Sequence, residues 1–106
     1  MKSIGIVKEL HKKAIKKPRA YVRKGSYLGF YDDRDGSFEL SHYGVDIFKY
    51  DAKTFSIGKG AYSASDRDAI NTMLSEIGEH SYCARIRDFR LEIDGVDGNR
   101  RFIGIV

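Results

Sequence analysis

The hydrophobic pattern of the chain changes its period near Pro18, and this change predicts a change of secondary structure. Over residues 3–17, Ile4, Val7, Leu10 and Ala14 recur at helical spacing, and lysine is the commonest residue at the other positions. This pattern predicts an amphipathic helix that ends at the proline. Beyond it, apolar positions recur about every second residue and include many aromatic and β-branched side chains, which is typical of strands.

Turn-forming residues divide the region after this proline into consecutive strands. The cluster at residues 32–37 separates a strand-like run over residues 21–31 from a return strand over residues 38–43, which favours a hairpin. A second antiparallel pair is predicted over residues 45–50 and 54–57. The middle of the chain therefore predicts a sheet built from neighbouring strands.

A second helix is predicted over residues 65–77, where Ser65 can serve as N-cap and the apolar stripe consists of Ile70, Met73, Leu74 and Ile77. The run over residues 82–94 predicts either a bulged strand or two strands in succession, and residues 101–106 predict a final strand. The order is helix, four strands, helix, two strands. We therefore predict a single α+β domain over residues 1–106, with two helices and a largely antiparallel sheet of about six strands.

Charge separates the N-terminal segment from the rest of the chain. Residues 1–24 hold nine basic side chains against Glu9 alone, whereas the whole chain carries a net charge of +4. We expect this basic arm to bind nucleic acid or an acidic protein surface, and the alternative is a solvated helix face that only aids solubility. The predicted contact residues are Lys8, Lys12, Lys13, Lys16, Lys17, Arg19, Tyr21, Arg23 and Lys24.

Little in the sequence indicates catalysis, a cofactor or a membrane partner. The single cysteine, Cys83, excludes an internal disulfide and a multi-cysteine zinc site, and it suits the reducing cytoplasm of a bacterial host cell. Asp46 with Asp51 and Lys53 is the nearest approach to the acidic cluster of a metal-dependent nuclease. No apolar run approaches the ~18 residues of a membrane span. We therefore predict a binding protein, not an enzyme, with no cofactor and no metal site.

One stretch carries a more specific pattern. A strand that begins with Tyr43 is followed, at residues 62–71, by the segment YSASDRDAIN at the start of the second predicted helix. This pattern resembles small uncharacterised domains encoded by phages and mobile elements of Gram-positive bacteria. Arg67 and Asn71 lie at i and i+4 near Tyr62, so we expect a secondary contact patch of these three; the alternative is helix capping beside a polar outer face.

Together these features predict a small accessory protein of a phage or mobile element that engages nucleic acid or a nucleic-acid-bound host protein. An anti-CRISPR inhibitor of a Cas nuclease is one concrete form, because a basic wedge could contact nucleic acid while the acidic remainder faces the basic channel of the nuclease. The alternatives are a non-specific DNA- or RNA-binding protein and, from another class, a small metal-dependent nuclease.

Overall fold

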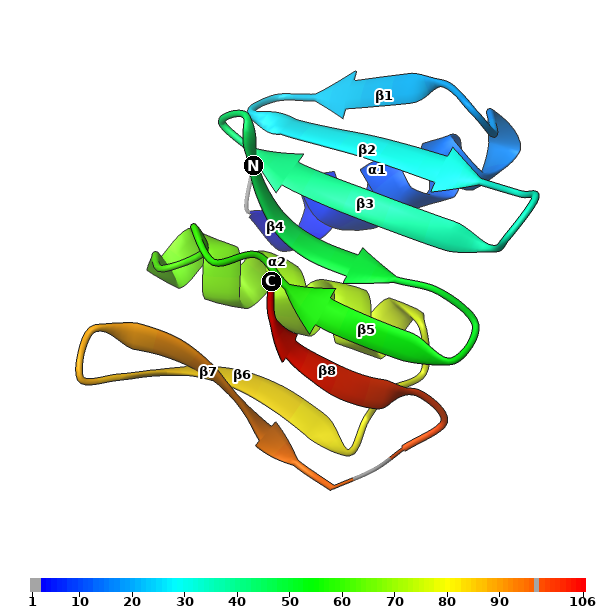
Figure 1. The fold of residues 1–106 in the computed structure, drawn as a ribbon. Helices are drawn as coiled ribbons and strands as arrows, with labels where there is room; N and C mark the ends of the chain where they lie inside the picture. The colour runs from blue at the N-terminus through cyan, green and yellow to red at the C-terminus, as the bar shows by residue number, and fades with distance from the viewer. Residues whose placement is uncertain (1–2, 97) are drawn as a thin grey trace.

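Two helices cover one face of a sheet in the computed structural model, which describes residues 3–96 and 98–106 (Figure 1). The order of helices and strands confirms the predicted α+β domain. The elements are α1 (Ser3–Lys16), β1 (Tyr21–Lys24), β2 (Tyr27–Asp32), β3 (Ser37–His42), β4 (Val45–Tyr50), β5 (Thr54–Ile57), α2 (Ala64–Glu76), β6 (Tyr82–Arg87), β7 (Arg90–Gly95) and β8 (Arg101–Ile105). Neither described helix has the length and apolar character that crossing a bilayer would require.

The main sheet has six strands in the order β1-β2-β3-β4-β5-β8, while β6 and β7 form a separate hairpin. The pairs from β1 to β5 are antiparallel, and β8 returns parallel to β5. Two predicted strand regions are each resolved into a hairpin. The run over residues 21–31 turns at Gly25, whose φ is 59°, and the run over residues 82–94 turns at Asp88 and Phe89, so two strands in succession is the correct alternative.

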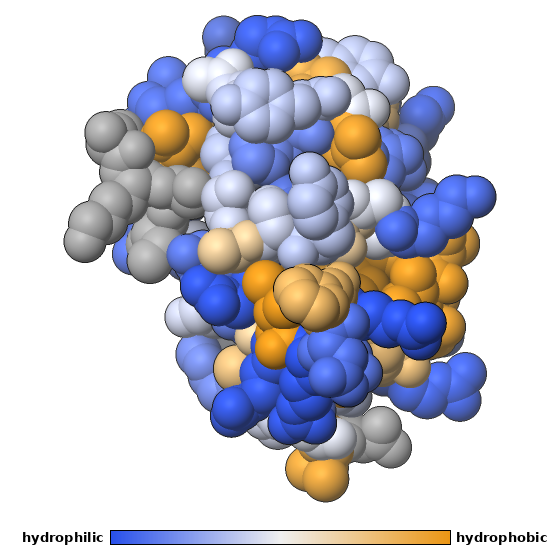
Figure 2. Space-filling model, turned by 90° about the vertical axis from the view of Figure 1, so that its left-hand side faces the viewer, coloured by the Kyte–Doolittle hydropathy of each residue, from blue (hydrophilic) through white to orange (hydrophobic). Residues whose placement is uncertain are grey.

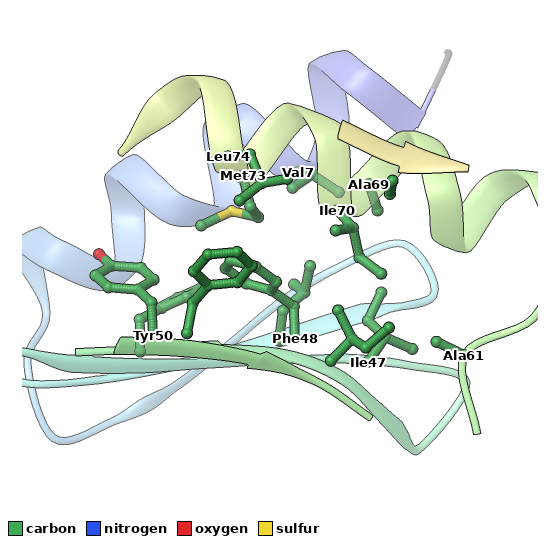
Figure 3. Close-up of a cluster of buried hydrophobic side chains, with 14 of the residues drawn as sticks. Val7, Ile47, Phe48, Tyr50, Ala61, Ala69, Ile70, Met73 and Leu74 are labelled. Atoms are coloured by element: carbon green, nitrogen blue, oxygen red, sulfur yellow. The ribbon is translucent and has the colours of Figure 1, made fainter. Parts of the chain in front are cut away.

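The core lies between the helices and the covered face of the sheet (Figure 3). The helical spacing explains why the core lies there, because it places the apolar residues of each helix on the one side that faces the sheet. Phe48 and Tyr50 of β4 point toward the helices from the sheet. The buried apolar side chains of the helices are Val7, Leu10 and Ala14 of α1 and Ala69, Ile70, Met73 and Leu74 of α2. Ile77, the predicted end of the second stripe, is only partly buried.

The N-cap of α2 is Ser63, so the prediction of Ser65 is wrong. The Ser63 hydroxyl accepts a hydrogen bond from the backbone N–H of Asp66 at 3.1 Å, and the Asp66 carboxylate accepts the backbone N–H of Ser63 at 3.3 Å. These reciprocal bonds form a capping box. Asp66 is also hydrogen-bonded to His42 on β3. This contact with a distant strand fixes Asp66 in the first turn of α2 and favours Ser63 over Ser65 as the N-cap.

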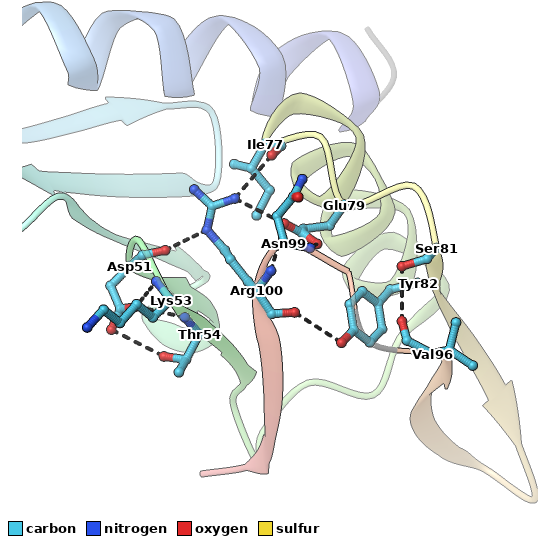
Figure 4. A network of polar contacts seen from close by, with 10 residues as sticks. All are labelled: Asp51, Lys53, Thr54, Ile77, Glu79, Ser81, Tyr82, Val96, Asn99 and Arg100. Carbon is cyan, nitrogen blue, oxygen red and sulfur yellow. Dashed lines mark hydrogen bonds and ion pairs between the residues drawn. The ribbon is translucent and has the colours of Figure 1, made fainter.

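A buried ion pair attaches the start of β8 to the end of α2 (Figure 4). The Glu79 carboxylate accepts hydrogen bonds from the backbone N–H groups of Asn99 and Arg100, at 2.9 and 3.1 Å, and from the Arg100 guanidinium at 3.2 Å. The guanidinium also donates to the carbonyls of Asp51 and Ile77, at 2.5 and 3.1 Å. The Arg100 side chain therefore connects three segments: the β4–β5 turn, the end of α2 and the residues that lead into β8.

Candidate nucleic-acid interface

Five predicted contact lysines form one exposed surface on α1 and at its C-terminal end. They lie on the side of the helix that faces away from the core, because the apolar stripe of α1 packs on β1, β2 and α2. We call this surface the lysine face; its members are Lys8, Lys12, Lys13, Lys16 and Lys17. From Lys8 to Lys16 the helix rises by about 12 Å, at ~1.5 Å per residue.

Two of the predicted contact cations are already paired with carboxylates. Arg19 lies 3.1 Å from Asp33, and Lys24 forms an ion pair with Glu9. The hydrogen bond and charge of Lys24 lower the pKa of Glu9, and the nearby lysines of α1 add to this effect. Within the described part of the chain, no carboxylate lies within 4 Å of the charged group of Arg23 or of any lysine in the lysine face. These six charges are therefore available to an external anion.

Tyr21 and Arg23 lie on a different surface from the lysine face. On β1 they pair with Phe30 and Leu28 of β2. They alternate with Val22, whose partner Gly29 faces Leu10 of α1, so their side chains lie on the sheet face that the helices leave uncovered. The exposed ring of Tyr21 packs against that of Phe30, with 4.9 Å between the ring centroids. The predicted basic arm is thus divided by the edge strand β1, with the lysines on the helix side and Tyr21 and Arg23 on the other.

Two of the three residues of the predicted secondary patch bond to other parts of the protein. The side-chain amide of Asn71 donates to the carbonyl of Ala84 at 3.0 Å and accepts its backbone N–H at 2.7 Å, so it attaches β6 to α2. Arg67 lies 3.0 Å from its neighbour Asp68. Tyr62 precedes the helix and is well exposed. A contact role for Tyr62, Arg67 and Asn71 remains a prediction, but two of the three have partners inside the protein.

A buried histidine–aspartate pair, which was not predicted from the sequence, lies near the start of α2. His42 Nδ1 lies 2.7 Å from an Asp66 carboxylate oxygen, and the imidazole stacks on the ring of Tyr27 at 4.1 Å. Burial opposes ionisation of Asp66, but the hydrogen bonds from His42 and from the backbone N–H groups of Tyr62 and Ser63 hold its pKa below the usual value. The capping-box spacing of residues 63 and 66 was the available signal for Asp66; no local pattern marks His42.

This pair resembles part of a catalytic triad, which would also need a nucleophile bonded to the imidazole. Among the described residues, no serine or threonine hydroxyl and no cysteine thiol is hydrogen-bonded to the His42 ring. The pair does join the end of β3 to the start of α2. This link gives the pair a structural role.

The acidic residues of the nuclease alternative are engaged in separate local bonds. Asp46 accepts a hydrogen bond from the Ser41 hydroxyl at 2.7 Å. Asp51 accepts the backbone N–H groups of Lys53 and Thr54, both at 2.8 Å, and so holds the β4–β5 turn. Throughout residues 3–96 and 98–106, no three His, Cys, Asp or Glu side chains gather as a metal site requires.

No protein-family model, no curated protein and no solved structure matches this chain. The likeness of residues 43–77 to domains of phages and mobile elements therefore stays a prediction.

Proposed function

We propose that the protein binds the phosphate backbone of nucleic acid through the lysine face. The observation that carries this proposal is the set of five exposed lysines with no carboxylate within 4 Å, on a helix whose opposite side is buried against the sheet and α2. Cations placed on phosphates release counterions, and this drives association without reading the bases. Over the ~12 Å from Lys8 to Lys16, the two strands of a duplex together carry about seven phosphates, which is enough for five lysines.

Stabilisation of the helix alone does not account for the lysine face. Lys13 and Lys16 stand in the last turn of α1, where cations interact favourably with the helix dipole by ~0.3–1 kcal/mol each. Lys8 and Lys12 lie outside that turn, so the dipole effect does not explain them. Phosphate binding explains all five positions together.

The setting that we propose is a small accessory protein of a phage or mobile element, acting by binding in the cytoplasm of a bacterial host. The likeness of residues 43–77 supports this setting. The target is nucleic acid itself or a nucleic-acid-bound host protein, and inhibition of a Cas nuclease is one specific form of this function.

Replacement of Lys12, Lys13, Lys16 and Lys17 by glutamine tests the proposed surface. Each lost phosphate contact costs about 0.9 logarithmic units of affinity near 0.1 M salt, so four lost contacts weaken binding by up to ~10³–10⁴-fold. The assay is fluorescence anisotropy with labelled duplex and single-stranded DNA, and circular dichroism verifies that the variant is folded.

A second quadruple variant serves as the matched control. It carries glutamine at four exposed cations outside α1 that have no carboxylate within 4 Å in the described chain: Lys53, Lys59, Arg90 and Arg101. We expect this variant to lose far less affinity, although its net charge changes by the same amount. Equal losses in the two variants would show that net charge alone, and not the lysine face, governs binding.

A further inference from the structure

Three exposed aromatic side chains gather at one end of the molecule. The β3–β4 turn, the segment before α2 and the β6–β7 turn all lie at this end, on the left of Figure 1. They carry Tyr43, Tyr62 and Phe89, whose exposed fractions are 80%, 72% and 98%. Figure 2 looks onto this side and shows apolar residues collected among hydrophilic ones. We call the surface formed by these three residues the aromatic end surface.

The backbone gives no reason for two of these aromatic residues. Tyr43 has a φ of 52° and Phe89 a φ of 62°, in the left-handed region where glycine is favoured and a bulky residue is strained. Both stand in tight hairpin turns, and the second turn position is Gly44 in one hairpin but Phe89 in the other. Because the Phe89 ring is almost wholly exposed, the core gives no reason for it either. Strain at an exposed aromatic residue points to a contact outside the chain.

Two shallow hollows flank Tyr62. One, of about 260 Å³, lies beside Phe89 and has an apolar lining that includes Ile57, Leu91 and Ile105. The other, of about 240 Å³, lies between Tyr62 and Tyr43. Both are smaller than the ~300–1,000 Å³ of pockets that enclose a small-molecule ligand. Their size suits single apolar side chains of a larger partner.

The charge around the hollow beside Phe89 has one sign. Lys59 and Arg90 line it, no carboxylate does, and neither cation has a carboxylate within 4 Å in the described part of the chain.

The aromatic end surface is held in place before any partner binds. The ring of Tyr43 lies 4.5 Å from that of His42, and Asp66 accepts the backbone N–H of Tyr62. Such a prearranged surface reduces the entropy lost on binding.

We propose that the aromatic end surface docks a segment of a partner protein that inserts apolar side chains beside Tyr62 and places carboxylates on Lys59 and Arg90. Aromatic anchors with apolar hollows and a charged rim are typical of protein interfaces. The aliphatic lining favours apolar side chains over nucleobases, which would leave their polar edges unpaired there. This goes beyond the proposed function, because it concerns a different surface. The lysine face extends to the C-terminal end of α1, on the right of Figure 1, whereas the aromatic end surface lies on the left. Two separate surfaces allow the protein to hold nucleic acid and a protein together.

Selection from a displayed library of random peptides, each about 12 residues long, tests this proposal on the full chain. We expect enriched clones to combine Phe, Leu or Trp with flanking Asp and Glu. Synthetic, fluorescein-labelled versions of these clones are then measured by fluorescence polarisation. Failure to enrich such clones, or enrichment of basic peptides, would overturn the proposal.

The Phe89→Gly variant separates binding from folding. Glycine suits the left-handed φ, so the variant should unfold at the same or a higher temperature while it binds the peptides at least ~30-fold more weakly. The double variant Lys59→Gln, Arg90→Gln should bind the acidic peptides more weakly but should bind their uncharged analogues as the wild type does. Val96→Ser, at another exposed apolar residue, should bind as the wild type does. Peptide binding that persists in Phe89→Gly would contradict the docking site.

Three further outcomes count against this occupant. Binding of oligo(dT) that is lost in Phe89→Gly would identify a base-stacking site. Self-association that disappears in Phe89→Gly, seen by sedimentation equilibrium, would identify a second copy of the chain as the occupant. Loss of peptide binding in the quadruple lysine-face variant would show that the acidic peptides bind α1 instead. Because we expect that variant to bind peptides normally, failure of one proposal can be distinguished from failure of the other.

Discussion

The replacement Glu79→Gln removes the negative charge from a carboxylate whose side chain is fully buried. In the wild type this group accepts two backbone N–H bonds and one guanidinium bond, all from Asn99 and Arg100. The amide of glutamine has a single acceptor oxygen, and its NH₂ group would face these donors. The Arg100 guanidinium, itself largely buried, would also lose its counter-charge.

The expected loss follows from these contacts. Hydrogen bonds to a charged acceptor contribute ~1.5–3 kcal/mol each, but the three bonds share one carboxylate and do not add. Removal of one partner of a buried ion pair costs about 3–5 kcal/mol, and the remaining amide oxygen keeps the loss near the lower limit. We therefore expect the free energy of unfolding to fall by about 3 kcal/mol, which lowers Tm by roughly 12–24 °C in a domain of this size.

Urea unfolding followed by far-UV circular dichroism measures this loss, because the chain has no tryptophan to report by fluorescence. Glu39→Gln is the matched control. Its carboxylate lies 3.4 Å from Lys49, but the two side chains are 47% and 56% exposed, so the control should lose less than ~1 kcal/mol. Equal, small losses in both variants would refute the reasoning and show that water reaches the Glu79–Arg100 pair.

Three other predictions concern the core, a buried histidine and the absence of cleavage. Leu74→Ala should lower the free energy of unfolding by about 2–5 kcal/mol in thermal melts, and a loss below ~1 kcal/mol would mean that this face of α2 is not core. Burial lowers the pKa of His11, so the unfolded chain takes up its proton first as the pH falls; stability should therefore decrease from pH 7 to 5, by at most ~1.4 kcal/mol per pH unit, and more steeply than in His11→Gln. Equal slopes would contradict this role. Neither the wild type nor Asp46→Asn or Asp51→Asn should cleave plasmid or RNA with Mg²⁺, and nicking that co-purifies with the protein and vanishes in a variant would make it a nuclease.

Those parts of the fold that depend on neighbouring residues could be predicted from the sequence. The apolar stripes of both helices are local periodicities, and each faces the core where the spacing places it. The turn at residues 32–37 and the antiparallel strands beside it follow from turn chemistry. The charge of residues 1–24 likewise indicated the lysine face before its geometry was known.

Features that depend on distant residues could not be predicted. Glu79 and Arg100 are 21 residues apart, and His42 and Asp66 are 24 residues apart; nothing local to either member indicates its partner. The parallel pairing of β8 with β5 depends on the same tertiary contacts. The division of the basic arm by β1 follows from strand register, which the charge pattern does not contain.

The salt dependence of nucleic-acid binding tests the central claim most directly. The measurement is the affinity for a labelled duplex of about 20 base pairs, by fluorescence anisotropy, between about 50 and 200 mM KCl. With five lysines on phosphates, a plot of log K against log salt should have a slope near −4.5 for the wild type and near −1 for the variant with glutamine at positions 12, 13, 16 and 17. The same slope in both proteins would contradict phosphate binding by the lysine face.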